Sequence, residues 1–240
     1  MTAEEWKKIT EEFKAAPKYN FFDLQKELYH SCLTQGYSID EIKKFSSLCF
    51  QLASNMDEEE SKPFINEISR KNWLNLLNTL EVTKLRESTT LTPKQKSLLG
   101  LYFYLAMVEG ANASTIQFLL LMLLKNGKQL IIRKKGGNQY IKSFNRVREL
   151  SLSVKLGFLK DNGLELAIKG IDTGLRNCVA HQDFLVYEDG SIRNLKTEKL
   201  IDLEARLDSF CLSNSLVLCV LNQSMNIISP STDSSLNIKH

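Results

Sequence analysis

The stretch from residue 93 to residue 124 constrains the fold most, because it is long, apolar and almost uncharged. Thr92 and Pro93 match the N-cap and first-turn proline of a helix. Between Leu98 and Leu124 the only charged residue is Glu109. The length would suffice to cross a membrane, but a charge at mid-span is costly, and polar residues follow it at 112, 114, 115 and 117. We therefore expect core or dimer-interface helices with a break near Gly110, rather than a membrane span.

The first ninety residues show helical periodicity and helix-start signals. Ser38 followed by Glu41 forms a capping box, and the acidic run 57–60 suits the positive end of a helix dipole. The expected helical segments are 6–13, 22–35, 39–55, one opening at 57–60, and 73–86. We expect residues 1–90 to form an N-terminal helical subdomain that ends in a weak linker at 87–92.

Residues 91–228 are expected to form a second helical domain, followed by a disordered tail at 229–240. The pattern predicts a basic loop or turn at 125–137, helices at 140–158 and 163–181, and a hairpin at 184–192 around Asp189-Gly190. Thr197 is expected to cap a last helix that runs to about residue 225. Its inward residues would be Leu200, Leu203, Leu207, Phe210 and Cys211. The predicted fold class is all-α with one short hairpin-like segment.

Charge is unevenly distributed along the chain. Residues 125–160 hold ten Lys and Arg against one acid, Glu149, whereas the remainder holds 21 bases and 27 acids. A basic segment in an acidic chain suggests a polyanion partner such as RNA, although a solvated face would have the same composition. The candidate RNA contacts are Arg133, Lys134, Lys135, Lys142 and Arg146.

The five cysteines are odd in number and include no CxxC pair, which suggests free thiols in a reducing compartment. The N-terminus is charged and amphipathic, unlike a signal peptide. These features favour a cytoplasmic protein. No phosphate-binding glycine loop and no cluster of metal ligands is found in the sequence, so we expect no cofactor and no metal.

The candidate site is the run Arg176-Asn177-Cys178-Val179-Ala180-His181. It ends a segment whose apolar residues recur every three or four positions, so its polar residues either cap a helix or serve a site. Arginine offers a planar fork of donors to phosphate oxygens, and histidine can both take and give a proton near neutral pH. This combination suits phosphodiester chemistry without a metal.

The string from residue 175 to residue 181, Leu-Arg-Asn-Cys-Val-Ala-His, resembles the signature of the HEPN superfamily. The resemblance extends over about residues 95–225 and rests on an Arg and a His separated by four residues near the end of an amphipathic helix. Many such all-helical proteins are ribonucleases of toxin–antitoxin, abortive-infection and CRISPR-linked defence systems. The resemblance therefore implies a HEPN-like bundle with endoribonuclease activity, and an antitoxin or other regulatory protein as a partner. Some HEPN toxins are silenced at a tyrosine two residues after the His, where this chain has Asp183.

One chain offers one suitable histidine, whereas RNA cleavage without metal needs a base and an acid. A two-fold homodimer would bring two copies of the motif into one cleft, as HEPN ribonucleases do. There His181 would move protons, Arg176 would hold the phosphate, and Asn177 would orient His181 or contact the phosphate. Alternatively, Arg176 pairs with a carboxylate such as Glu109 and His181 only closes a helix. An inert scaffold that binds nucleotide, RNA or a protein is then the second reading.

Overall fold

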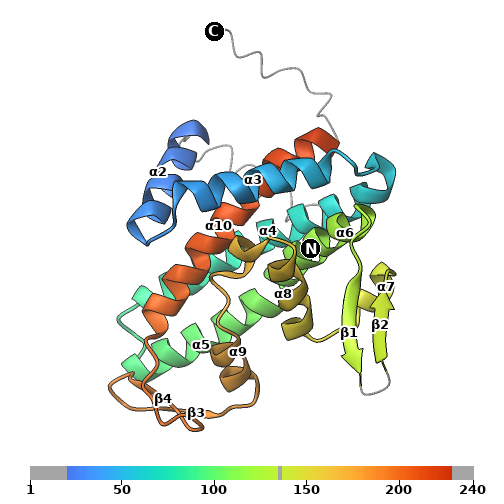
Figure 1. Ribbon diagram of the computed structural model, residues 1–240. Coiled ribbons are helices and arrows are strands. Elements are labelled where there is room, and N and C mark those ends of the chain that lie inside the picture. The colour runs from blue at the N-terminus through green and yellow to red at the C-terminus, as the bar shows by residue number, and fades with distance from the viewer. Residues whose placement is uncertain (1–20, 135–136, 229–240) are drawn as a thin grey trace.

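The computed structural model describes residues 21–134 and 137–228, and this part of the chain is predominantly helical (Figure 1). The expected helix at 6–13, Lys135 and the tail at 229–240 lie outside the described residues. The elements in chain order are α2 Phe21–Thr34, α3 Ile39–Ala53, α4 Glu58–Glu87, α5 Pro93–Glu109, α6 Ala111–Lys125, β1 Leu130–Lys134, β2 Gly137–Ile141, α7 Phe144–Arg148, α8 Leu152–Asp161, the 3-10 helix η1 Glu165–Ile168, α9 Thr173–Ala180, β3 Phe184–Val186, β4 Ile192–Asn194 and α10 Leu203–Ile228.

The predicted helix starts at residues 38, 57 and 92 are confirmed, because local side chains satisfy the free N–H groups of each first turn. Ser38 and Glu41 form the expected capping box, with hydrogen bonds of 3.0 and 2.9 Å. Asp57 accepts from the Glu60 N–H at 3.0 Å and opens α4, which continues past Pro63 as one helix. Thr92 caps α5 at the proline that was expected to start it.

The apolar stretch forms two helices that break at Gly110, as predicted. Gly110 has φ −93° and ψ −94°, and a Cβ there would lie 2.6 Å from the Ala106 carbonyl oxygen. The stretch Pro93–Lys125 is long and apolar enough for a membrane span, yet 71% of its most apolar window is buried inside the protein. Its side chains from Phe118 to Leu123 are buried. They therefore build the protein core, as expected.

Two clusters of buried side chains hold the helices together. The larger cluster joins α3, α4, α6, α8 and α10 through residues that include Phe45, Ile68, Phe118, Leu159 and Val220. The smaller one joins α5, α9, α10 and the β3–β4 hairpin through residues that include Leu101, Tyr104, Val179, Ile192 and Phe210. The N-terminal helices thus share a core with helices from the second half of the chain. Figure 1 shows α5, α9, β3 and β4 together at the lower end of the molecule.

The basic loop predicted at 125–137 is instead largely a β-hairpin, and the helix predicted at 140–158 is two shorter ones, α7 and α8. In the hairpin, β1 pairs antiparallel with β2, and Leu130 pairs with Ile141. Both of these side chains are buried, whereas Ile131 and Tyr140 between them are exposed. The apolar residues 130–132 favour a strand, and the burial of Leu130 in the core holds that strand in place. These two effects outweigh the polar composition that suggested a loop.

The single helix predicted at 163–181 is also wrong, because the chain is interrupted at Gly170. The Gly170 backbone packs directly on α10, where a Cβ would lie 2.6 Å from Ser213 Cβ and 2.8 Å from the Ser209 carbonyl oxygen. The segment therefore forms η1, a turn and the short helix α9. Its predicted apolar stripe is nonetheless buried at Leu164, Leu175 and Val179.

The β3–β4 hairpin around Asp189-Gly190 is confirmed, but the start of the last helix is not at Thr197. The Asn194 side chain accepts hydrogen bonds from the N–H groups of residues 196 and 197, at 2.9 and 3.0 Å, and so holds a turn there. Asp202 caps α10 instead, accepting from the Ala205 N–H at 3.1 Å. Leu200, expected to face inward, precedes that helix and is 73% exposed.

Candidate functional site

Helix α9 carries the Arg176–His181 motif and is fixed at its N-terminus by two polar side chains. Asp172 caps it by accepting from the Leu175 N–H at 2.9 Å. The buried Tyr104 hydroxyl of α5 accepts from the Asp172 N–H at 2.8 Å and donates to its carbonyl oxygen at 3.2 Å. Burial raises the pKa of Tyr104 to about 12, so the hydroxyl stays neutral over the ordinary pH range.

The C-terminus of α9 ends at His181 in a Schellman turn. The Gln182 N–H donates to the Val179 carbonyl oxygen at 3.1 Å, and the Asp183 N–H donates to that of Cys178 at 2.8 Å. Gln182 takes a left-handed backbone, φ 58°, which normally favours glycine. Because the chain turns away there, the His181 side chain is exposed at the helix end.

Arg176 is held by a carboxylate and an amide on the surface. Its Nε and Nη2 atoms contact Glu109 at the end of α5, and its Nη1 donates to Asn177 Oδ1 at 2.8 Å. The side chains of Arg176 and Glu109 are 27% and 46% exposed. A guanidinium carries five N–H groups, so Nη1 and Nη2 each keep an N–H for another acceptor.

The structure thus brings together three of the four residues expected at the site, Arg176, Asn177 and Glu109. The pairing of Arg176 with Glu109, which the sequence offered as the alternative to a catalytic site, is confirmed, and Glu109 is partly exposed. The side-chain amide oxygen of Asn177 accepts a hydrogen bond from Arg176. Asn177 is hydrogen-bonded to His181 through the backbone, where the His181 N–H donates to the Asn177 carbonyl oxygen at 3.0 Å. Within the described part of the chain, the His181 imidazole has no hydrogen bond or ion pair.

Cys178 lies in the motif but is built into the core. It is buried, its Sγ donates to the Asp183 carbonyl oxygen at 3.1 Å, and burial, with the Asp183 charge, raises its pKa. A thiol held in the neutral form is a poor nucleophile. Asp183 also forms an ion pair with Lys196 and accepts from the Leu195 N–H at 2.9 Å. Its role here is to tie the end of α9 to the β3–β4 hairpin.

The predicted RNA contacts lie in and beside the β1–β2 hairpin, away from α9. Arg133 and Lys134 belong to β1, Lys142 follows β2, and Arg146 belongs to α7. Lys142 and Arg146 are exposed. Figure 1 shows the hairpin at one edge of the molecule and α9 at the lower end, with α8 between them. The basic residues and the motif therefore do not form one compact site.

Two further residues of the basic segment 125–160, which were not among the predicted RNA contacts, lie nearer to the motif. Lys155 of α8 donates to the Arg148 carbonyl oxygen at 2.7 Å and is half-buried. Burial and the nearby Arg148 charge lower its pKa, while Glu109 of the motif partly offsets them. Arg148 also helps to lower the pKa of Glu67 on α4, after Lys71. The positive charge of residues 125–160 thus extends to the Glu109–Arg176 pair.

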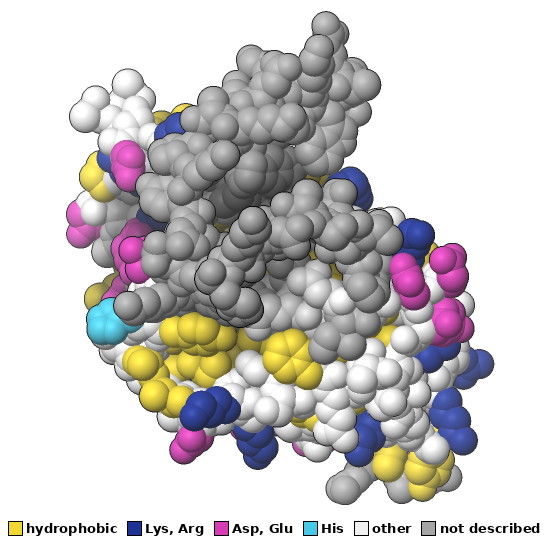
Figure 2. Space-filling view, turned by 90° about the horizontal axis from the view of Figure 1, so that it is seen from above, with side chains coloured by type: hydrophobic (Ala, Val, Ile, Leu, Met, Phe, Trp, Pro, Cys, Tyr) yellow, Lys and Arg dark blue, Asp and Glu magenta, His cyan; other side chains and the backbone are white. Residues whose placement is uncertain are grey.

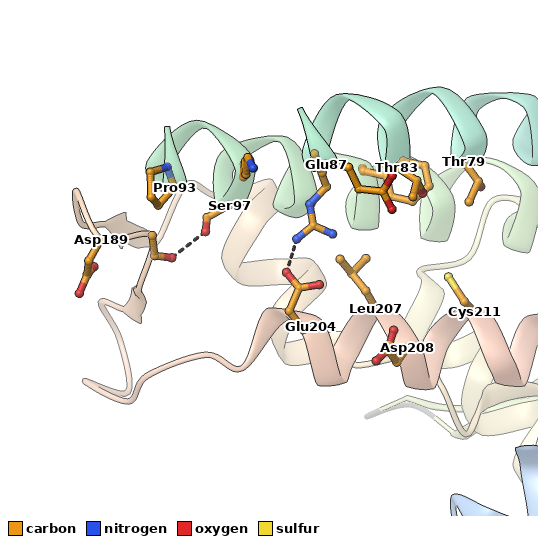
Figure 3. Close-up of a pocket in the computed structure, with 14 residues that line it drawn as sticks. Thr79, Thr83, Glu87, Pro93, Ser97, Asp189, Glu204, Leu207, Asp208 and Cys211 are labelled. Atoms are coloured by element: carbon orange, nitrogen blue, oxygen red, sulfur yellow. Dashed lines mark hydrogen bonds and ion pairs between the residues drawn. The ribbon is translucent and has the colours of Figure 1, made fainter. Parts of the chain in front are cut away.

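A separate cavity of about 580 Å³ lies between α4, the start of α5, the β3–β4 turn and the start of α10 (Figure 3). An ion pair between Arg86 and Glu204 crosses it, and Ser97 Oγ donates to the Gly190 carbonyl oxygen at 2.6 Å. Its described lining holds four carboxylates, at 87, 189, 204 and 208, against the bases Arg86 and Lys96. This charge balance is unfavourable for RNA.

Fold and site together define a predominantly helical protein with a surface Arg–Glu–Asn cluster beside a helix-terminal histidine. Among the described residues, no three His, Cys, Asp or Glu side chains are grouped as the ligands of a metal would be. No protein-family model, no curated protein and no solved structure matches the chain.

Proposed function

We propose that the chain is a metal-independent endoribonuclease of HEPN type that acts as a homodimer in the cytoplasm, in a toxin or antiviral defence role. The observation that carries the proposal is the motif itself. Arg176 and Asn177 are paired with each other on the surface, beside a histidine exposed at the end of the same helix. Such a group is open to a phosphate and to a second copy of the chain.

In the proposed reaction the 2′-OH of one nucleotide attacks the adjacent phosphorus, and the bond to the 5′-oxygen breaks. His181 takes the proton of the 2′-OH, and the partner subunit's His181 gives a proton to the leaving oxygen. The free N–H groups of Arg176 bind the phosphate and stabilise the charge that develops on it. Asn177 holds Arg176 through its amide oxygen, and its amide nitrogen is then directed to the substrate.

Glu109 has a supporting role in this proposal. It fixes the Arg176 fork from one side, and an ion pair exposed to this degree contributes at most about 1 kcal/mol to stability. A carboxylate that orients an arginine also lowers the affinity of the site for phosphate, because it repels the anion. The Glu109→Gln variant therefore separates the two effects, since the amide keeps the shape and removes the charge.

The test is the cleavage of a single-stranded RNA in the presence of EDTA. We expect products that end in 2′,3′-cyclic phosphate or 3′-phosphate, and no cleavage of DNA, because DNA lacks the 2′-OH. His181→Ala and Arg176→Ala should each lower the rate roughly 10²- to 10⁴-fold. Lys43→Ala, an exposed residue of α3, serves as a control that should cut at the wild-type rate. Light scattering should give a dimer for all four proteins, and a monomer would refute the shared cleft.

The second candidate is a catalytically inert HEPN-like scaffold that binds nucleotide, RNA or a protein partner. The contact of Glu109 with Arg176 favours it, because that carboxylate occupies the side of the guanidinium that carries Nε. Wild-type protein that binds RNA and leaves it intact would support the scaffold and refute the nuclease.

A further inference from the structure

The outer face of the β1–β2 hairpin carries an apolar pair that the core does not cover. Ile131 and Tyr140 are direct partners in the antiparallel register. Their exposed fractions are 52% and 58%, while Leu130 and Ile141, which pair beside them, are buried at 2% and 5%. Partners in a ladder place their side chains on the same face. The hairpin thus holds an aromatic ring and a branched side chain side by side in solvent, on a strand pair that is anchored to the core by its other face.

The surroundings of this pair are basic. Lys128, Lys142 and Arg146 flank the hairpin, are exposed, and form no ion pair with any residue in the described ranges 21–134 and 137–228. Nearby Lys125 differs, because it pairs with Glu60 of α4. In Figure 2, Lys and Arg side chains gather at the lower right beside a hydrophobic group, on the side of the molecule where Figure 1 shows the hairpin. An apolar patch surrounded by unpaired positive charges favours the binding of a polyanion that also has flat apolar surfaces, such as the faces of nucleic-acid bases.

We propose that the β1–β2 hairpin binds single-stranded nucleic acid by stacking a base on the Tyr140 ring beside Ile131, while Lys128, Lys142 and Arg146 contact the backbone phosphates. Base stacking on an aromatic side chain needs an exposed base face, which a single strand provides and a duplex hides within its stack. The polyanion must therefore be single-stranded. The inference deepens the proposed function and rests on it in that RNA is the expected nucleic acid.

In this arrangement the hairpin binds the RNA and the motif on α9 cleaves it. The hairpin and α9 lie at different places on the molecule (Figure 1). Lys155 of α8 contacts Arg148 of α7 and is near enough to Glu109 for the two charges to interact. A strand held on Tyr140 would thus have positive charge along its way toward the Arg176 side chain. In this arrangement loss of the hairpin contact lowers affinity for RNA and leaves the chemistry at the motif intact.

The experiment measures fluorescence anisotropy with a labelled single-stranded oligouridylate of about 12 nucleotides, within the range of known single-strand site sizes. Oligothymidylate of the same length and a blunt RNA duplex are the comparison probes. All proteins carry His181→Ala, so that the probe stays intact. Tyr140→Ala should weaken binding of the single strands roughly 5- to 150-fold, as expected for one stacked base. Tyr140→Phe, which keeps the ring, should bind about as well as the parent.

Two controls make the result specific. Leu185→Ala removes a side chain that is 47% exposed on the other hairpin, and it should leave affinity unchanged. Replacing Lys128, Lys142 and Arg146 together by Ala should reduce the slope of log affinity against log salt by about 2, since each phosphate contact in a single strand contributes roughly 0.7. Replacing Lys43 and Lys44 of α3 should not change the slope. The circular dichroism spectrum of each variant verifies that it is folded.

The outcomes are distinguishable from those of the nuclease test. Equal affinity of Tyr140→Ala and its parent for both single strands overturns the inference, whether or not the wild-type protein cuts RNA. Tighter binding of the duplex than of the single strands also overturns it. If Tyr140→Ala changes the oligomeric state and not the affinity, the face is an interface between copies, which overturns it as well. If affinity falls as expected and the wild-type protein does not cut, the hairpin site stands and the nuclease proposal fails.

Discussion

Replacement of Tyr104 by Phe tests how the motif helix is held in place. The Tyr104 ring is fully buried and packs edge-on against Phe210, with 5.5 Å between ring centroids, and Phe would keep this contact. What it removes is the hydroxyl that bridges the N–H and the carbonyl of Asp172. A buried group that loses its partner costs about 1–3 kcal/mol. We expect the free energy of unfolding at pH 8 to fall by that amount.

The same hydroxyl makes the difference between the two proteins depend on pH. Tyrosine has a pKa near 10 in an unfolded chain and about 12 at position 104 in the folded protein. Its folded pKa is raised, so its contribution is complete below pH 10 and is lost as the pH rises toward 12. Because one pKa unit corresponds to 1.36 kcal/mol, the advantage of the wild type over Tyr104→Phe should shrink by about 1.4 kcal/mol between pH 8 and pH 11.

Urea unfolding of both proteins, followed by circular dichroism at pH 8 and pH 11, measures this difference. Other groups that titrate in this range, including Cys49 with a pKa raised to about 12 by burial, are common to both proteins and cancel. If the two proteins differ by the same amount at both pH values, or do not differ at pH 8, the hydroxyl does not anchor α9 and the reasoning is refuted.

Two further substitutions address the backbone on either side of the site. Gln182→Gly should raise the free energy of unfolding by about 0.5–1 kcal/mol in urea titrations. A left-handed backbone, φ 58°, is strained for glutamine, and relief of this strain outweighs the extra conformational entropy that glycine has in the unfolded chain. An unchanged free energy of unfolding would contradict the left-handed turn after His181. Gly110→Ala should lower the free energy of unfolding by about 1–3 kcal/mol, since the new Cβ would lie 2.6 Å from the Ala106 carbonyl oxygen and the backbone would have to shift. Gly157→Ala in α8, where a Cβ meets nothing within 4 Å, is the matched control and should be neutral or stabilising.

Local sequence signals were sufficient wherever the interaction is local. The capping box of Ser38 and Glu41 needs only residues three apart, and the turn at Asp189-Gly190 needs only its own backbone angles. The break at Gly110 was also predictable, because this glycine directly follows Glu109, the only charged residue of the apolar stretch, and precedes its polar residues at 112, 114 and 115. The Arg176–Glu109 pair is not local, and the sequence offered it only as an alternative, because Glu109 is the only charged residue between Leu98 and Leu124.

Only the tertiary structure decided the rest, because those features depend on contacts between distant segments. The 163–181 segment has a continuous helical stripe, yet Gly170 must pack on Ser209 and Ser213 of α10, and that contact ends the helix. The residues of β1 could have formed a polar loop, but Leu130 and Ile141 gain more by burial in the core cluster than the loop gains by solvation. The same anchoring exposes Tyr140 on the opposite face. The periodicity of a sequence predicts which side of a helix or strand is apolar. The length of that element and the face it exposes to solvent depend on the segments it packs against.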